Sequence, residues 1–129
     1  MEILSSRILV AVGNLARSRT FYEQTLGLSI YREYGVGGMV TGVVYFLGGG
    51  FLELTSGGAS TASDGVRVWL QVDDVVREAA RLADAGVMIR RPAECMPWGL
   101  IECWIEDPDG LELRLVEVPV DHPLRRRVQ

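Results

Sequence analysis

Three arginines and one glutamate are the strongest candidates for chemistry or ligand binding in this chain: Arg7, Glu53, Arg67 and Arg114. A guanidinium group stays protonated and has no acceptor lone pair, so it cannot ligate a metal but pairs well with carboxylates and phosphates. Two interpretations stay open. Glu53 and the arginines either form a structural ion-pair network or bind the carboxylate or phosphate of a ligand. If the chain catalyses a reaction, Glu53 is the expected base, although neighbouring arginines would lower its pKa.

Three tryptophans are further candidates for ligand contact. Trp69 alternates with Arg67 along one predicted strand, so both side chains lie on the same face of a sheet. Trp98 lies in the predicted loop of residues 96–99, and Trp104 lies in a later predicted strand. Indole rings stack on planar ligands, but they also pack in protein cores. Both roles stay open for all three tryptophans.

Other reactive side chains have simpler explanations. Capping and turn hydrogen bonds account for the paired acids Asp73, Asp74, Asp107 and Asp109. Cys95 and Cys103 show no CxxC spacing and are predicted to be free thiols. The only histidine, His122, lies beyond the regular elements, so no neighbouring imidazole is expected to activate a cysteine.

The composition predicts one globular domain over residues 1–129. Hydrophobic residues make up 48% and charged residues 23%, and the net charge of −4 gives no reason to expect nucleic acid. The short run of arginines at 125–127 is predicted to be a solvated tail. No signal peptide is apparent, and the uncharged stretch 34–52 contains seven glycines, which favours hairpins over a membrane helix. We therefore expect a cytoplasmic protein without membrane or nucleic-acid partners.

An internal repeat organises the elements that position these residues. Residues 7–17 match 67–77, and the later segment 51–54 matches 112–115. Apolar alternation predicts strands over 8–12, 28–34, 39–47, 51–55, 66–72, 87–91, 100–105 and 111–118. Helices are predicted from Asn14 to Gly27 and from Asp73 or Asp74 to Ala85, with a loop over 92–99 and a loosely ordered tail over 119–129. The order βαβββ thus occurs twice, in modules 5–56 and 66–118 joined by a linker over 57–65.

This order and its motifs resemble the vicinal oxygen chelate superfamily, which contains glyoxalase I, extradiol dioxygenases, fosfomycin-resistance enzymes and bleomycin-resistance proteins. The residues that carry the resemblance are 12–18, 21–22, 26–28, 51–54, 72–75, 85–86, 107–110 and 113–115. The resemblance implies an α+β fold in which two tandem βαβββ modules form curved mixed sheets around a cup-shaped cavity. It also implies a homodimer.

The resemblance also shows where a metal site would lie. In metal-using members a histidine opens the first strand of each module, and a glutamate lies in each last strand. Here Arg7 and Arg67 occupy the histidine positions, Arg114 occupies the second glutamate position, and only Glu53 matches. Because arginine cannot ligate and three cations repel a divalent ion, we predict no metal and no cofactor.

The preferred function is metal-independent binding of an aromatic or anionic small molecule, as in the drug-sequestering bleomycin-resistance members, with a role in antibiotic resistance. The predicted ligand-binding residues are Arg7, Glu53, Arg67, Trp69, Trp98 and Arg114. One alternative is a glyoxalase-, isomerase- or dioxygenase-type enzyme of the same superfamily. A second alternative is a non-catalytic structural or regulatory module.

Overall fold

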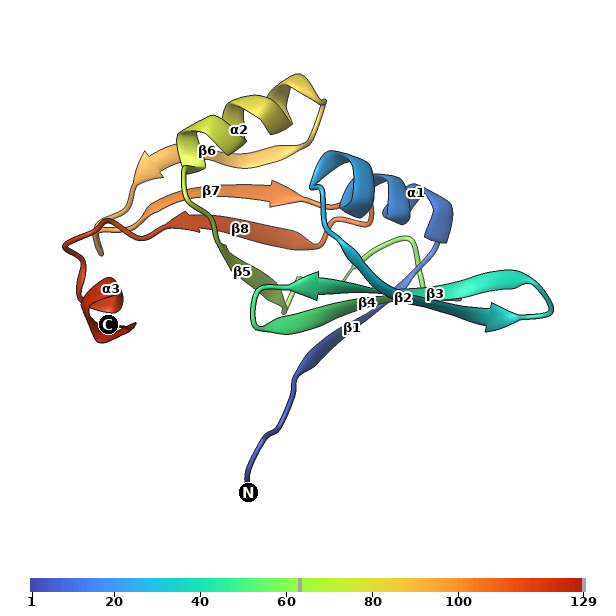
Figure 1. Ribbon diagram of the computed structural model, residues 1–129. Coiled ribbons are helices and arrows are strands. Elements are labelled where there is room, and N and C mark those ends of the chain that lie inside the picture. The colour runs from blue at the N-terminus through green and yellow to red at the C-terminus, as the bar shows by residue number, and fades with distance from the viewer. Residues whose placement is uncertain (63, 129) are drawn as a thin grey trace. The chain divides into compact units, whose positions relative to one another are not determined.

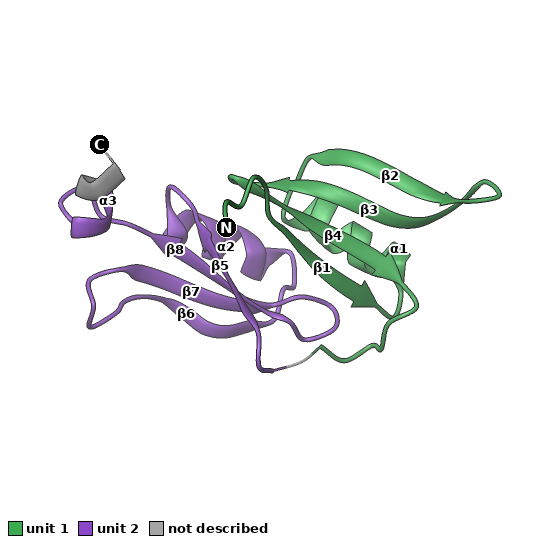
Figure 2. Ribbon diagram, turned by 90° about the horizontal axis from the view of Figure 1, so that it is seen from below, with its two compact units in different colours: residues 1–62 green, residues 63–129 purple. Residues whose placement is uncertain are grey.

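The computed structural model describes residues 1–62 and 64–128, with side chains described up to residue 125. The chain divides into two compact units, unit 1 over Met1–Ala62 and unit 2 over Ser63–Gln129 (Figure 2). Their boundary falls inside the predicted linker. Each unit contains a four-stranded mixed sheet with a helix on one face (Figure 1). The predicted α+β class and the repeated βαβββ order are therefore confirmed.

Unit 1 contains the first copy of the repeat. Its elements are β1 Arg7–Val12, α1 Leu15–Arg19, the π-helix η1 Thr20–Thr25, β2 Ile30–Val36, β3 Met39–Leu47 and β4 Gly50–Ser56. The strand order is β1-β4-β3-β2, in which β1 runs parallel to β4 and the other neighbours are antiparallel. The Asn14 side chain caps α1 by accepting a hydrogen bond from the backbone N–H of Arg17.

Unit 2 repeats this arrangement and adds a short helix. Its elements are β5 Arg67–Gln71, α2 Val75–Asp84, β6 Ile89–Cys95, β7 Ile101–Glu106, β8 Glu112–Glu117 and α3 Pro123–Val128. The strand order is β5-β8-β7-β6, again with one parallel pair, β5 and β8. Asp74 caps α2 as Asn14 caps α1, accepting from the backbone N–H of Arg77 at 3.0 Å.

The apolar core of each unit lies between its sheet and its helix. In unit 1 the alternate strand residues Val43, Tyr45 and Leu54 are buried, as are Phe21 and Tyr22 of the helix. In unit 2, Ile105 and Leu113 of the sheet and Val75 and Leu82 of α2 are buried. We call the opposite face of each sheet its open face, because no helix of the same unit between residues 1–62 or 64–118 packs on it (Figure 1).

Tyr45 lies on the helix side of the unit 1 sheet and not on its open face. Its hydroxyl donates a 2.7 Å hydrogen bond to Glu23 of η1, and Arg19 pairs with the same carboxylate at 2.6 Å. Burial and the bond to Glu23 raise the pKa of Tyr45. Because Tyr45 is fully buried, this bond satisfies the one polar atom that its side chain brings into the core.

Two parts of unit 2 differ from the prediction. The expected loop over 92–99 is wrong in its first half, because β6 continues to Cys95; it is an edge strand with irregular register, which tolerates Pro92. The expected loose tail is also wrong, because residues 123–128 form α3 and Arg125 donates its Nε–H to the Val118 carbonyl at 3.0 Å. Among the described residues, no helix is both long and apolar enough to cross a membrane.

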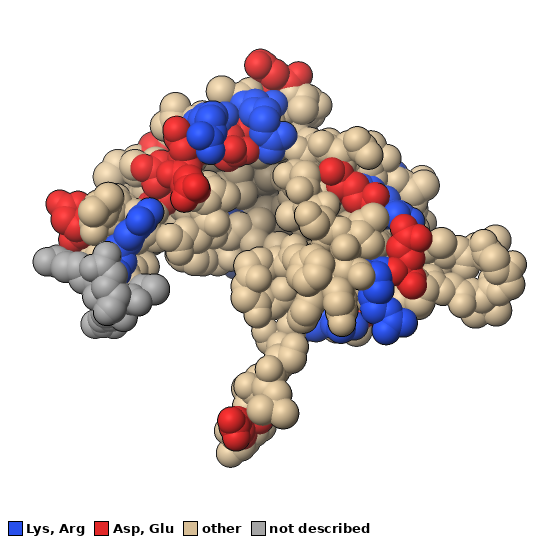
Figure 3. All heavy atoms as spheres, viewed as in Figure 1, with Lys and Arg blue, Asp and Glu red and all other residues tan. Residues whose placement is uncertain are grey.

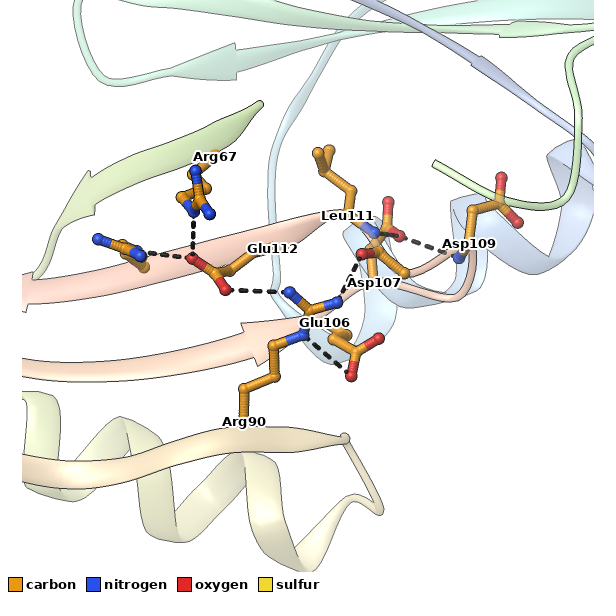
Figure 4. Close-up of polar contacts among 9 residues, drawn as sticks. Arg67, Arg90, Glu106, Asp107, Asp109, Leu111 and Glu112 are labelled. Atoms are coloured by element: carbon orange, nitrogen blue, oxygen red, sulfur yellow. Dashed lines mark hydrogen bonds and ion pairs between the residues drawn. The ribbon is translucent and has the colours of Figure 1, made fainter. Parts of the chain in front are cut away.

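The turn between β7 and β8 is held by a buried aspartate, as Figure 4 shows. Oδ1 of Asp107 accepts hydrogen bonds from the backbone N–H groups of Asp109 and Leu111 at 2.9 and 2.8 Å. Gly110 completes the turn with a φ of 89°, which is strained for other residues. This turn sets where β8 begins, and therefore where Glu112 lies.

Replacing Asp107 by alanine should lower the free energy of unfolding by about 2–3 kcal/mol, because two backbone N–H groups at a buried turn lose their acceptor. Urea unfolding measures the change. Asp73→Ala, at an exposed position, is the matched control and should cost much less. Equal losses in the two variants would contradict the structural role of Asp107.

Candidate functional site

A carboxylate with two donors lies on the open face of unit 1. Glu53 of β4 pairs in register with Val44 of β3, one residue away from the helix-side Tyr45. Its Oε1 accepts a 2.8 Å hydrogen bond from Arg7 of β1, and its Oε2 accepts one from the hydroxyl of Tyr34 in β2. Three of the four strands therefore contribute to one polar cluster, of which Arg7 and Glu53 were predicted.

Tyr34 reaches Glu53 because Gly42 leaves room for its ring. A Cβ added to Gly42 would lie 2.1 Å from Cζ of Tyr34, which is far inside van der Waals contact. The sequence analysis did not single out Tyr34. Its position opposite a glycine in the neighbouring strand is a signal that appears only once the register is known.

The electrostatics make Glu53 a weak base. Hydrogen bonds from Tyr34 and from Arg7 hold the pKa of Glu53 below its usual value and outweigh the opposite effect of burial. The bond to Glu53 in turn raises the pKa of Tyr34. Glu53 is therefore ionised at neutral pH, and Tyr34 keeps its proton.

Aromatic rings lie beside this cluster on the open face of unit 1. The ring centroids of Tyr31, Phe46 and Phe51 lie 5.0–5.7 Å apart, and the guanidinium of Arg7 lies 5.5 Å from the Phe51 centroid. Tyr31 and Phe46 are each about half exposed. This face therefore combines an ion pair with accessible aromatic surface.

A second carboxylate organises the open face of unit 2. Glu112, at the start of β8, is paired with three arginines: Arg114 at 2.6 Å, Arg90 at 3.0 Å and Arg67 at 3.2 Å. Arg90 also pairs with Glu106 at 3.1 Å (Figure 4). Burial alone would raise the pKa of Glu112, but the hydrogen bonds from Arg114 and Arg90 and the charge of Arg67 outweigh it and lower that pKa.

Glu112 and Arg90 are further site residues that the sequence analysis did not single out. Glu112 lies on the open face of unit 2. The predicted residues Arg67 and Arg114 meet on Glu112. One signal was available, because Glu112 lies two residues before Arg114 in the same strand and thus shares its face.

A row of alternating tryptophan and arginine crosses the sheet of unit 2. The strand registers place Trp69 of β5 beside Arg114 of β8, Arg114 beside Trp104 of β7, and Trp104 beside Arg91 of β6. Cζ of Arg114 lies 3.7 Å from the Trp104 centroid, and Cζ of Arg91 lies 4.6 Å from it. Both distances fall within the range of cation–π contacts. Trp69 ends the row on the edge strand and is 49% exposed, so packing in the core does not explain it.

A third carboxylate fixes two of the tryptophans. Glu102 of β7 is buried, and its two oxygens accept the indole N–H groups of Trp98 at 2.7 Å and Trp104 at 2.8 Å. Trp98 itself is 53% exposed. Two of the three candidate tryptophans are thus linked through Glu102. Because Trp104 also belongs to the row, Trp98 is connected to the row through Glu102.

In the described part of the chain, no three His, Cys, Asp or Glu side chains gather into a group that could hold a metal ion. The charged surface of both units instead consists of interspersed arginines and acids, as Figure 3 shows for one face.

The family model described as Glyoxalase/Bleomycin resistance protein/Dioxygenase superfamily matches residues 5–115. No curated protein is matched. Among solved structures, a glyoxalase-related enzyme from Fulvimarina pelagi superposes with a TM-score of 0.74 at 21% identity, covering 93% of this chain and 91% of that one. A superfamily member from Sphaerobacter thermophilus DSM 20745 gives 0.70 at 26% identity and covers 91% and 98%. TioX from Micromonospora sp. ML1 gives 0.69 at 21% identity and covers 88% and 98%.

Replacing Tyr34 by phenylalanine should raise the pKa of Glu53 toward its ordinary value, because the Tyr34 hydroxyl makes the largest contribution that lowers it. An NMR titration of the Glu53 carboxyl carbon measures the shift. Tyr31→Phe removes a hydroxyl from a nearby ring of the same face and serves as the control. An unchanged Glu53 pKa in the Tyr34 variant would show that the hydrogen bond is not formed.

Replacing Glu112 by glutamine should reduce the free energy of unfolding by about 2–4 kcal/mol at neutral pH, because three guanidinium groups lose a buried partner. The folded-state pKa of Glu112 is lowered. Its carboxylate therefore stabilises the fold above the unfolded-state pKa, and this contribution is lost as the pH falls through the folded-state pKa. The stability gap between wild type and variant should narrow in acid, as denaturant unfolding at several pH values would measure.

The matched control is Glu106→Gln, which removes a more exposed carboxylate that pairs with Arg90. This change should lower the free energy of unfolding by no more than about 1 kcal/mol. A difference in the free energy of unfolding between wild type and Glu112→Gln that stays constant with pH would contradict the ionic role of Glu112.

Proposed function

Because the chain belongs to the glyoxalase/bleomycin resistance protein/dioxygenase superfamily, we propose that it binds a small planar aromatic molecule that carries an acidic group, and that it does so without a metal. The proposed binding surface is the open face of unit 2, with Trp69, Trp98, Arg67 and Arg114 as the contacting residues. Arg7 and Glu53 form the corresponding cluster of unit 1. The proposal includes a homodimer that sequesters its ligand, as the resemblance to bleomycin-resistance members implies, and a cytoplasmic location, as the sequence analysis expects.

The observation that carries this proposal is the row of Trp69, Arg114, Trp104 and Arg91. Flat guanidinium and indole groups alternate along it, and the half-exposed ring of Trp69 ends it. An aromatic ligand placed on Trp69 gains a stacking contact on a ring that water otherwise covers. A flexible or purely aliphatic ligand gains less from such a surface.

The guanidinium donors of this face favour an acidic group on the ligand. Arg67, Arg90 and Arg114 carry three positive charges, which Glu102, Glu106 and Glu112 balance, so the preference depends on the hydrogen-bond donors of the arginines and not on an excess of charge. Arg67 and Trp69 lie two residues apart on the same face of β5. A ring on Trp69 thus places a carboxylate within reach of the guanidinium groups of Arg67 and Arg114, which hold acids by paired hydrogen bonds.

The same residues favour binding over metal-dependent catalysis. Arg7, Arg67 and Arg114 stand at the positions where, by the resemblance, metal-using relatives place ligands, and a guanidinium group cannot take that role. Their contacts with Glu53 and Glu112 give them a structural function as well. The lowered pKa of Glu53 makes it a poor general base near neutral pH.

The proposal predicts that 2-naphthoate quenches the tryptophan fluorescence and raises the melting temperature, whereas the neutral 2-naphthamide binds more weakly. Trp69→Ala should weaken 2-naphthoate binding by about threefold to tenfold, the worth of one stacking contact. Val76→Ala, on the exposed side of α2, is the control and should leave the affinity unchanged. Isothermal titration calorimetry measures all four affinities.

Two results would overturn the proposal. One is a screen of aromatic acids that produces neither quenching nor a thermal shift. The other is a stoichiometric amount of iron, manganese, nickel or zinc in the purified protein by elemental analysis, which would favour an enzyme of the same superfamily.

A further inference from the structure

We infer that His122 is a positioning residue for Trp98, and that protonation of its imidazole releases this tryptophan from its place beside the binding row. The inference concerns regulation of the proposed site and rests on the proposed function for its effect on a ligand. The positioning itself rests on contacts within unit 2 alone.

The two ring nitrogens of His122 each have a backbone partner. Nε2 lies 3.0 Å from the carbonyl oxygen of Trp98, and Nδ1 accepts a 3.2 Å hydrogen bond from the backbone N–H of Leu124. A carbonyl can only accept and an amide N–H can only donate, so Nε2 must carry the proton and Nδ1 must be bare. The partners thus select one neutral tautomer.

Further contacts fix the imidazole and its segment. The ring packs against the backbone of Gly99, where an added Cβ would lie 3.2 Å from Cδ2 of His122. Leu124 is the second residue of α3, so His122 caps this helix through its side chain. Arg125 ties the same segment to the carbonyl of Val118. The chain beyond β8 is therefore attached at both the loop before β7 and the strand end.

Trp98 connects this attachment to the binding row. Its indole N–H donates to Glu102, whose other oxygen accepts from Trp104. Trp104 in turn lies between Arg91 and Arg114 in the row. The orientation of Trp98 is therefore set from two sides, by Glu102 at its ring and by His122 at its backbone.

A second proton on His122 would break this arrangement. A protonated Nδ1 would point its hydrogen at the N–H of Leu124, so two donors would face each other and the cap would be lost. The new positive charge would also lie at the start of a helix, where the helix dipole disfavours it. Both effects weaken the cap of α3, while Nε2–H can still donate to the Trp98 carbonyl, so acid should shift the segment together with the Trp98 backbone bonded to it.

Among the residues whose side chains the structure describes, Asp121 and Arg125 lie on the segment of His122, and Glu102 lies beyond Trp98. The loop of residues 96–100 and residues 118–120 contribute no titratable side chain. An acid transition is thus attributable to His122 if it disappears with the imidazole.

The test follows the three indole N–H resonances of ¹⁵N-labelled full-length protein, assigned with single Trp→Phe variants. In the wild type, the Trp98 resonance should move between about pH 7.5 and about pH 5.5. His122→Gln keeps a donor for the Trp98 carbonyl but cannot titrate, so its Trp98 resonance should lie at the same position at both pH values. His122→Asn keeps an acceptor for Leu124 but is too short to reach Trp98, so that resonance should be displaced at both.

Asp121→Asn is the matched control and should keep the wild-type transition. A Trp98 resonance that is constant in the wild type would overturn the inference. An equal transition in His122→Gln would do the same, because it would assign the titration to another group such as Glu102. Far-UV circular dichroism of each variant verifies that it is folded.

A binding arm separates this inference from the proposed function. The affinity for 2-naphthoate should fall by about fivefold from about pH 7.5 to about pH 5.5 in the wild type, roughly the worth of one hydrogen bond, and should stay constant in His122→Gln. If the resonance titrates as expected but 2-naphthoate binds at neither pH, the proposed function fails and the positioning role stands. If 2-naphthoate binds and the resonance does not move, the positioning role fails and the proposed function stands.

Discussion

A buried carboxylate surrounded by guanidinium groups imposes the strongest constraint on unit 2. Glu112 is 7% exposed, and leaving its charge without partners in that place would cost several kcal/mol. Its three arginines come from β5, β6 and β8, so the ion pairs of Glu112 fix side chains of three strands at once. Arg114 can then lie flat on Trp104 because its Nε is already held by Glu112. The aromatic surface of this face thus depends on an ionic contact.

The two units share one sheet architecture but carry different residues on their open faces. Each sheet buries its alternate apolar residues under a helix, which leaves the other alternate set on the open face. In unit 1 that set contains Glu53 with one arginine and one tyrosine; in unit 2 it contains Glu112 with three arginines. The carboxylate is shifted by two residues along the strand, since Glu53 pairs with Leu9 whereas Glu112 pairs with Arg67, the counterpart of Arg7. A repeat at the level of the fold therefore coexists with divergent chemistry.

The C-terminal segment is an addition to the repeated architecture, and it is linked to the open face of unit 2 through Trp98. It follows β8, forms a short helix, and attaches through His122 and Arg125 to backbone carbonyls of Trp98 and Val118. Backbone carbonyls are present at every residue, so nothing in their residue types marks them as partners. This explains why composition alone predicted a loose tail, and why the only histidine of the chain had no evident role.

The sequence by itself determined the repeat, the strand and helix order, a cap at Asn14 and a cap at Asp73 or Asp74, because each depends on residue types at short range or at a fixed period. Only the tertiary structure decided which carboxylate meets which arginine. That choice depends on strand register, and a shift of one residue exchanges the two faces of a strand. Thus the predicted Arg7–Glu53 pair was found, whereas Glu112, Arg90 and Tyr34 became visible only when neighbouring strands placed them beside their partners.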